Sequence, residues 1–122
     1  MSCKRKTSKG GDPLARHEFG IMQNTPRPGI RYDEYESQKY DCISVNDDFL
    51  ENIVDNFDHI DFYWHTLDVP GKGLAYTGIT LIPPTSTQAF IDVIKDVSGL
   101  SELMELSEKA LAQNKWIIHF GL

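Results

Sequence analysis

Alternating apolar and polar positions predict a β-hairpin between residues 61 and 83. Segments 61–68 and 74–83 are rich in aromatic and β-branched residues and flank a short Pro/Gly segment, which is typical of two paired strands. Pro70 and Gly71 suit the central positions of a type II turn, because proline fixes φ at the first position and glycine accepts a positive φ at the second. We therefore expect the hairpin to turn at these two residues.

Two further strands and one helix are predicted around the hairpin. Residues 42–45 and 116–120 alternate as short strands. Between the first of them and the hairpin, apolar residues recur at the spacing of one helix face, which predicts a helix from residue 47 to about residue 57. Asn46 suits the N-terminal cap of this helix, since an asparagine side chain accepts a backbone N–H in the first turn.

The segment between the hairpin and the last strand predicts two more helices. The first begins near Thr85, carries its apolar residues on one face and is stopped by Gly99. The second begins at Ser101, and Asn114 suits the left-handed position that follows a helix end. Each helix has one apolar face, so we expect both to pack on the sheet.

The resulting order of elements, β-α-β-β-α-α-β, predicts an α+β fold of the ferredoxin-like type. The last two helices then act as one crossover between strands. With the four strands numbered along the chain, we expect an antiparallel sheet in the order 4-1-3-2, with the helices on one face.

Composition divides the chain into two parts. Residues 1–31 carry seven basic and two acidic residues among several Gly and Pro residues, which predicts a flexible basic tail. Residues 32–122 carry five basic and sixteen acidic residues, a net charge of −11, and form the predicted single α+β domain. Such a domain repels phosphates, so the charge disfavours a nucleic-acid partner and favours a cationic one.

The two cysteines, Cys3 and Cys42, give neither a disulfide framework nor a zinc-binding spacing. We therefore expect no metal site and no cofactor. No apolar run approaches the ~20 residues that span a bilayer, and the basic start lacks the apolar segment of a signal peptide. The expectation is a cytoplasmic protein with reduced thiols and no membrane association.

Side-chain alternation predicts a polar and aromatic sheet face without a helix of its own. The strand residues expected beneath the helices are Ile43, Val45, Phe62, Trp64, Ile79, Leu81, Trp116, Ile118 and Phe120. The chemically relevant residues expected on the opposite, open face are Cys42, Tyr63, His65, Tyr76 and His119. An open face of this kind requires cover or a use. Three possibilities remain for this face: a homodimer through it, the N-terminal segment folded over it, and a bound ligand.

Candidate catalytic groups come from this open face. In the predicted strand order Cys42 and His119 are neighbours, and a thiol beside an imidazole is the minimum for an activated nucleophile. His65 and Tyr76 are candidates for acid–base chemistry. The alternative for all four is ordinary packing, with a buried thiol and cross-strand aromatic contacts.

Four carboxylates form an acidic stripe on the first predicted helix. Asp48, Glu51, Asp55 and Asp58 recur at the spacing of one face, opposite the apolar residues. No Lys or Arg occurs between residues 39 and 72 to neutralise them. The stripe is either a solvated helix face or a docking surface for a basic protein.

These observations favour a small, acidic, non-enzymatic interaction domain. It would bind a protein partner, as an inhibitor or immunity-type protein binds a basic enzyme, or associate with itself through the open sheet face. The alternative is a small enzyme or ligand-binding protein that uses the polar and aromatic residues of that face. Nucleic-acid binding is a weaker third option, because the charge of the domain opposes it.

Overall fold

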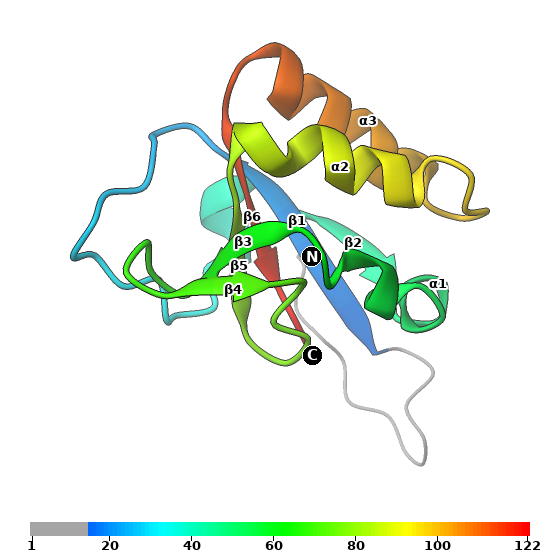
Figure 1. The fold of residues 1–122 in the computed structure, drawn as a ribbon, viewed down its shortest axis with the longest axis horizontal. Helices are drawn as coiled ribbons and strands as arrows, with labels where there is room; N and C mark the ends of the chain where they lie inside the picture. The colour runs from blue at the N-terminus through cyan, green and yellow to red at the C-terminus, as the bar shows by residue number, and fades with distance from the viewer. Residues whose placement is uncertain (1–14) are drawn as a thin grey trace.

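The computed structural model of this protein describes residues 15–122. A six-stranded antiparallel sheet has the order β2-β1-β6-β5-β3-β4, and two helices, α2 and α3, lie together over one of its faces (Figure 1). The strands are β1 (Arg16–Met22), β2 (Ile43–Asn46), β3 (Asp61–Trp64), β4 (Pro70–Lys72), β5 (Ile79–Ile82) and β6 (Trp116–Phe120). The helical elements are η1 (Ser37–Tyr40), α1 (Asp48–Glu51), η2 (Val54–Phe57), α2 (Pro84–Ile94) and α3 (Ser101–Ala112).

The predicted α+β fold with an antiparallel sheet is confirmed, but the ferredoxin-like strand order 4-1-3-2 is wrong. Strand β1 lies between β2 and β6, which the prediction made direct neighbours. Residues 16–22 had been assigned to the flexible tail of residues 1–31, whereas their alternating side chains enter the sheet and Phe19 is fully buried. The sheet therefore begins well before the predicted domain boundary at residue 32. Residues 1–14 of the predicted tail lie outside the described part of the chain.

The hairpin between β3 and β4 turns earlier than predicted. Pro70 and Gly71 belong to β4 and pair with β3, and the turn is formed by residues 65–69, where Trp64 N–H bonds to the carbonyl of Val69 at 3.0 Å. Gly71 is required for space, because a Cβ atom there would lie 2.5 Å from the ring of Trp64. Strand β5 pairs with the other side of β3, as the sequence predicted.

The helices differ in how well their sequence pattern predicts them. Strand β5 leads into α2, which begins at Pro84 in the first turn where proline is tolerated, and Asn114 after α3 is left-handed with φ 56°, as predicted. The single helix predicted for residues 47–57 is instead split into α1 and η2. Its carboxylates have no lysine partners one turn away, which weakens a continuous helix. Within residues 15–122, no helix combines the length and apolar character needed to cross a membrane.

Both faces of the sheet are packed against apolar residues. Phe19, Val45, Phe62 and Ile117 join the core beneath the helices, and Leu81, Ile118 and Phe120 join a second cluster on the opposite face. The predicted facing is confirmed for β2 and for Phe62 and Tyr63 of β3, and it is reversed for β5 and β6. Apolarity does not distinguish the faces of a strand that is buried on both sides, which explains the reversal.

The chain between β1 and β2 covers part of the second sheet face. The ring of Tyr35 meets Phe120 edge-on with centroids 5.4 Å apart, and the ring of Tyr40 in η1 lies 6.2 Å from that of Phe120. Tyr32 packs on the same cluster. The cover thus comes from residues 32–40, between β1 and β2.

Candidate functional site

Polar side chains from three neighbouring strands form a hydrogen-bonded chain inside the molecule. His17 of β1 and His119 of β6 stack with centroids 5.1 Å apart, and Nδ1 of His17 lies 2.9 Å from Nε2 of His119. Nδ1 of His119 lies 3.1 Å from the hydroxyl oxygen of Thr80 on β5. All three side chains are fully buried. Strand pairing places them side by side, since Phe19 and Thr80 both pair with His119 in the sheet.

Asp47 and Tyr76 lie at the outer end of this chain. One carboxylate oxygen of Asp47 accepts a hydrogen bond from Nε2 of His17 at 2.9 Å and another from the hydroxyl of Tyr76. Burial and the hydrogen bond to Asp47 raise the pKa of Tyr76, so this phenol stays protonated. Asp47 directly precedes α1, and the whole set, which we call the imidazole chain, ties α1 to the sheet.

One arrangement of protons satisfies every hydrogen bond in the imidazole chain. An ionised Asp47 can only accept, so Nε2 of His17 donates to it. Nδ1 of His17 then accepts from Nε2 of His119, and Nδ1 of His119 accepts the hydroxyl proton of Thr80. The Thr80 oxygen in turn accepts the N–H of Ala75 at 2.8 Å. His119 is neutral, because burial together with the nearby His17 holds the pKa of His119 well below its usual 6.5.

The imidazole chain brings together two of the four predicted catalytic candidates, His119 and Tyr76, through residues that were not predicted to act. Because His17, Thr80 and His119 have no exposed surface, a substrate cannot contact the imidazoles in this conformation. A satisfied buried polar network of this kind orders the parts of the structure that it joins. We therefore assign it a role in positioning α1 rather than in catalysis.

The predicted pair of Cys42 and His119 does not form. Phe19 of β1 stands between their strands and pairs with Ile43 on one side and His119 on the other. His119 contacts the ring of Phe19 in the helix-side core, whereas Cys42 packs in the second-face cluster. The thiol lies close to Gly20, where an added Cβ would be 2.9 Å from the sulfur. His119 and Cys42 therefore lie on opposite faces of the sheet, and His119 cannot activate this thiol.

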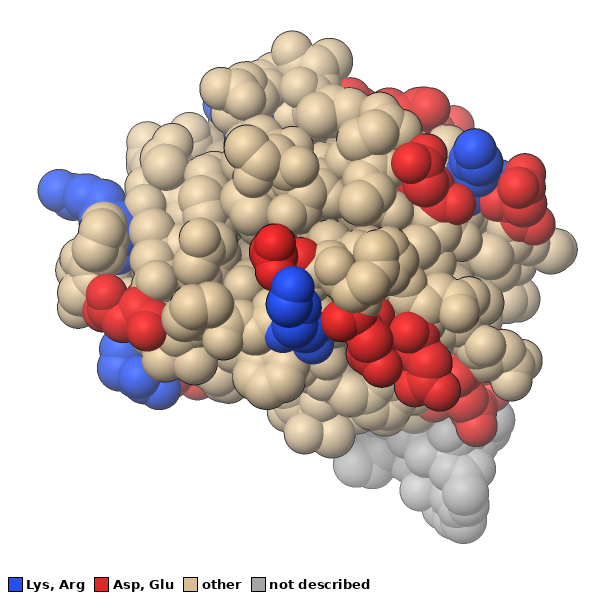
Figure 2. All heavy atoms as spheres, viewed as in Figure 1, with Lys and Arg blue, Asp and Glu red and all other residues tan. Residues whose placement is uncertain are grey.

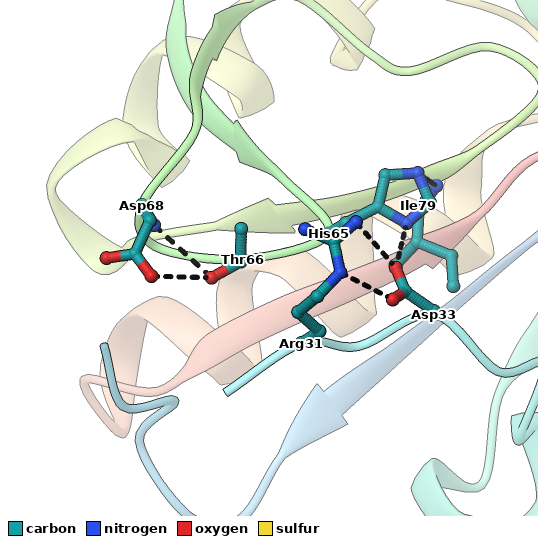
Figure 3. A network of polar contacts seen from close by, with 6 residues as sticks. All are labelled: Arg31, Asp33, His65, Thr66, Asp68 and Ile79. Atoms are coloured by element: carbon teal, nitrogen blue, oxygen red, sulfur yellow. Dashed lines mark hydrogen bonds and ion pairs between the residues drawn. The ribbon is translucent and has the colours of Figure 1, made fainter. Parts of the chain in front are cut away.

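His65 belongs to a separate polar network at the end of β3. Figure 3 shows its ring between Asp33 and Ile79, with Nδ1 3.0 Å from a carboxylate oxygen of Asp33. Nε2 accepts the backbone N–H of Ile79 at 3.4 Å, which leaves the ring proton on Nδ1, toward Asp33. Arg31 donates two hydrogen bonds to Asp33, at 2.6 and 3.2 Å, and these lower the pKa of the Asp33 carboxyl. The neighbouring Thr66 and Asp68 stabilise the turn after β3.

A cavity of ≈ 440 Å³ opens beside His65 on the second sheet face. Its walls come from the segment after β1, the end of β3, the start of β5 and the end of β6. The lining residues are Asp33, Tyr35, His65, Thr77, Gly78, Ile79, Phe120, Gly121 and Leu122. Of the four predicted candidates, His65 alone contributes to this cavity.

The sequence reasoning missed the partners that give these histidines their surroundings. His17 lies in the segment predicted to be a flexible tail, and Asp33 lies outside every predicted helix and strand. A signal existed for His17, because His17, Phe19 and Ile21 alternate with smaller or polar residues as in a strand. Asp33 offered none, since its contact with His65 depends on how the loop returns over the sheet.

The four carboxylates of the predicted acidic stripe are all exposed, although the helix that was expected to carry them is split. Asp48 and Glu51 lie on α1, Asp55 lies in η2, and Asp58 follows it; we call these four residues the acidic band. Figure 2 shows acidic side chains gathered along the part of the surface that contains α1. Among residues 15–122 no Lys or Arg forms an ion pair with the band, and the nearby Lys72 pairs with Asp61 at 2.6 Å.

Within residues 15–122, no group of three or more His, Cys, Asp or Glu side chains is placed to hold a metal ion. No known protein family, curated protein or solved structure matches this chain. The site geometry is therefore what a functional proposal for this α+β domain must start from.

Proposed function

We propose that this protein is an interaction domain that binds a basic protein through the acidic band. The observation that carries the proposal is the set of four exposed carboxylates along α1 and η2, none of which is paired with a Lys or Arg of residues 15–122. Like charges gathered in this way cost stability unless a partner supplies the opposite charge. A cationic surface would gain both attraction and faster association from the band.

An apolar side chain within the band supplies a contact of a different kind. Phe49 of α1 is 40% exposed, between Asp48 and Glu51 in the chain. Its ring is held in place against Gly99, where a Cβ atom would lie 2.5 Å from the ring. A fixed aromatic ring surrounded by charges is typical of the residues that dominate binding energy in protein interfaces.

The scaffold holds this surface in a defined position. The backbone N–H of Asp47 bonds to the carbonyl of Ala15 at 2.9 Å, and the Asp47 side chain is fixed by the imidazole chain. The side chain of Asn46 accepts the N–H of Asp48 at 2.8 Å, although the N-terminal cap position of α1 is Asp47 and not the predicted Asn46. A pre-ordered surface loses little conformational entropy on binding, and this supports an interface on α1.

The partner that we infer is a different protein rather than a second copy of this chain. Tyr35 and Tyr40 already lie over part of the second sheet face, which was the surface suggested for a homodimer. The acidic band would repel its own copy. Inhibition of a basic enzyme in the cytoplasm is the form of the proposal that fits the size and charge of the chain.

The test compares three forms of the domain. In the first variant the acidic band is neutralised by Asp48→Asn, Glu51→Gln, Asp55→Asn and Asp58→Asn. A matched control carries Glu102→Gln, Glu105→Gln and Glu108→Gln, which neutralise three exposed carboxylates of α3. Each form is used to capture proteins from a cell lysate, and each captured protein is then purified and its affinity measured by calorimetry.

We expect a basic protein that binds the wild type and the α3 control and binds the band variant at least about tenfold more weakly. Its affinity should fall as salt is raised, because exposed charges are screened. A partner that binds the band variant with unchanged affinity, or that carries an acidic surface, contradicts the proposal.

A further inference from the structure

We propose that the cavity beside His65 binds a small arylalkylamine, with the aromatic ring between apolar walls and the ammonium group at Asp33. This site is separate from the acidic band and does not depend on the proposed function. Its volume of ≈ 440 Å³ falls within the range of pockets that hold small organic ligands.

Aromatic and aliphatic side chains form the walls of the cavity. Tyr35 and Phe120 meet edge-on with centroids 5.4 Å apart, and Ile79 is almost fully buried beside them. A flat ring placed against these side chains removes apolar surface from water and gains aromatic contact. The walls therefore favour a ligand with an aromatic ring, and they do not determine its charge.

The polar groups at the other side of the cavity accept hydrogen bonds. Asp33 presents a carboxylate, and its Oδ2, which accepts one hydrogen bond from Arg31, retains a lone pair for a ligand. Nε2 of His65 accepts the N–H of Ile79, and its Nδ1, 3.0 Å from Asp33, is buried, so this imidazole offers a ligand no accessible N–H. A ligand must consequently bring its own donors, and an ammonium group brings three.

The charges in and around the cavity also favour a ligand with an ammonium group. The lining contains one carboxylate, Asp33, and no lysine or arginine. Arg31 lies outside the lining and its side chain is 60% exposed, so solvent screens its charge more than that of a buried group.

The backbone around His65 is shaped to hold its ring in this position. His65 has a positive φ of 66°, which is uncommon for a residue other than glycine. Gly78 lies so close that a Cβ atom there would be 2.8 Å from Nε2 of the ring. Backbone conformations that cost energy and are held by their surroundings occur preferentially at ligand sites. Here the conformation fixes the polar end of the cavity.

The experiment titrates the ¹⁵N-labelled protein with three ligands of the same shape: 2-phenylethylamine, 2-phenylethanol and 3-phenylpropionate. We expect the amine to shift the amide signals of Gly78, Ile79 and Gly121 and to bind at least about tenfold more tightly than the alcohol. This is the effect of one charge-assisted hydrogen bond. The carboxylate should bind more weakly than either.

Two variants locate the ammonium group. Asp33→Asn keeps the shape of the side chain and removes its charge, and it should weaken amine binding about tenfold while leaving alcohol binding unchanged. Asp96→Asn, an exposed carboxylate after α2, is the matched control and should leave both unchanged. The neutralised acidic band should likewise leave amine binding unchanged, which separates this site from the proposed protein interface.

Equal affinities for the amine and the alcohol in the wild-type protein would overturn the proposal, as would the absence of any shift at millimolar amine. Unchanged amine binding by Asp33→Asn would also overturn it. If Asp33→Asn fails to fold by circular dichroism, the comparison of the three ligands on the wild type still decides the outcome.

Discussion

His119 is a buried imidazole that stays neutral, and this makes the stability of the protein depend on pH. Its pKa in the folded state lies well below the 6.5 of an exposed histidine, because it is buried next to His17. Between these two pKa values the unfolded chain binds a proton at this residue and the folded chain does not. Stability contributed by His119 is therefore fully present above about pH 6.5 and is lost as the pH falls below it.

We predict that the free energy of unfolding falls by up to about 1.4 kcal/mol per pH unit below pH 6.5 for this one histidine. Urea unfolding between pH 8 and pH 5 measures the slope. His119→Gln should show a smaller slope and a lower stability at neutral pH. His59→Gln, at an exposed histidine, should keep the wild-type slope. Equal slopes for wild type and His119→Gln would contradict the assignment.

Residue types could be recognised from the sequence, whereas their partners could not. His65, Tyr76 and His119 do lie in polar networks, but those networks are completed by His17, Asp33 and Asp47. The predicted pairing of Cys42 with His119 is wrong, because β1, a strand that was not predicted, lies between β2 and β6. A contact between side chains depends on strand order and register, which the sequence of a single chain does not reveal.

Among the elements, β1 illustrates why a strand can escape recognition. Its alternation is regular, but Gly, Pro and basic residues surround it on both sides and are typical of a tail. Elements with a strong and isolated pattern, such as α3 and β6, were predicted nearly to the residue. The facing of β5 and β6 was reversed because both of their faces are buried, and the polar Thr80 and His119 lie on the helix side, where the imidazole chain satisfies them.

Because β1 lies inside the sheet, truncating its central side chain, Phe19, should lower the stability of the protein strongly. Phe19 is fully buried and packs against Phe90 of α2 with centroids 5.9 Å apart. Phe19→Ala should lower the free energy of unfolding by about 3–5 kcal/mol, which urea denaturation measures.

Phe49→Ala is the matched control for this prediction, since it removes the same side chain from the surface of α1. It should cost under about 1 kcal/mol and should weaken binding of the basic partner instead. A small loss of stability for Phe19→Ala would show that β1 is not an integral strand of the sheet.

At the scale of the whole molecule, the uneven distribution of charge connects stability with binding. Residues 15–122 carry eight basic and seventeen acidic side chains. Four of the acidic ones form the band that we propose as an interface, so the isolated domain carries a repulsion that a basic partner would relieve. Changes that reduce this repulsion should stabilise the free protein and weaken its complex.

Asp55→Lys tests this connection with one substitution. Placing a cation within the acidic band should raise the free energy of unfolding by about 0.3–0.5 kcal/mol in low salt. The gain should disappear in about 1 M salt, where the charges are screened. Urea unfolding at both salt concentrations measures it. A gain that persists in high salt would mean that it does not arise from charge.

The neighbouring positions of β1 and β6 have a consequence for how the protein forms. Glu18 pairs with Phe120 across the ladder, and His17 meets His119, a partner 102 positions later in the chain. During synthesis on the ribosome, β1 emerges before β6 and must wait for it before this ladder can close. Contacts between such distant segments slow folding, so the nascent chain keeps an unpaired edge on β1 until β6 has been synthesised.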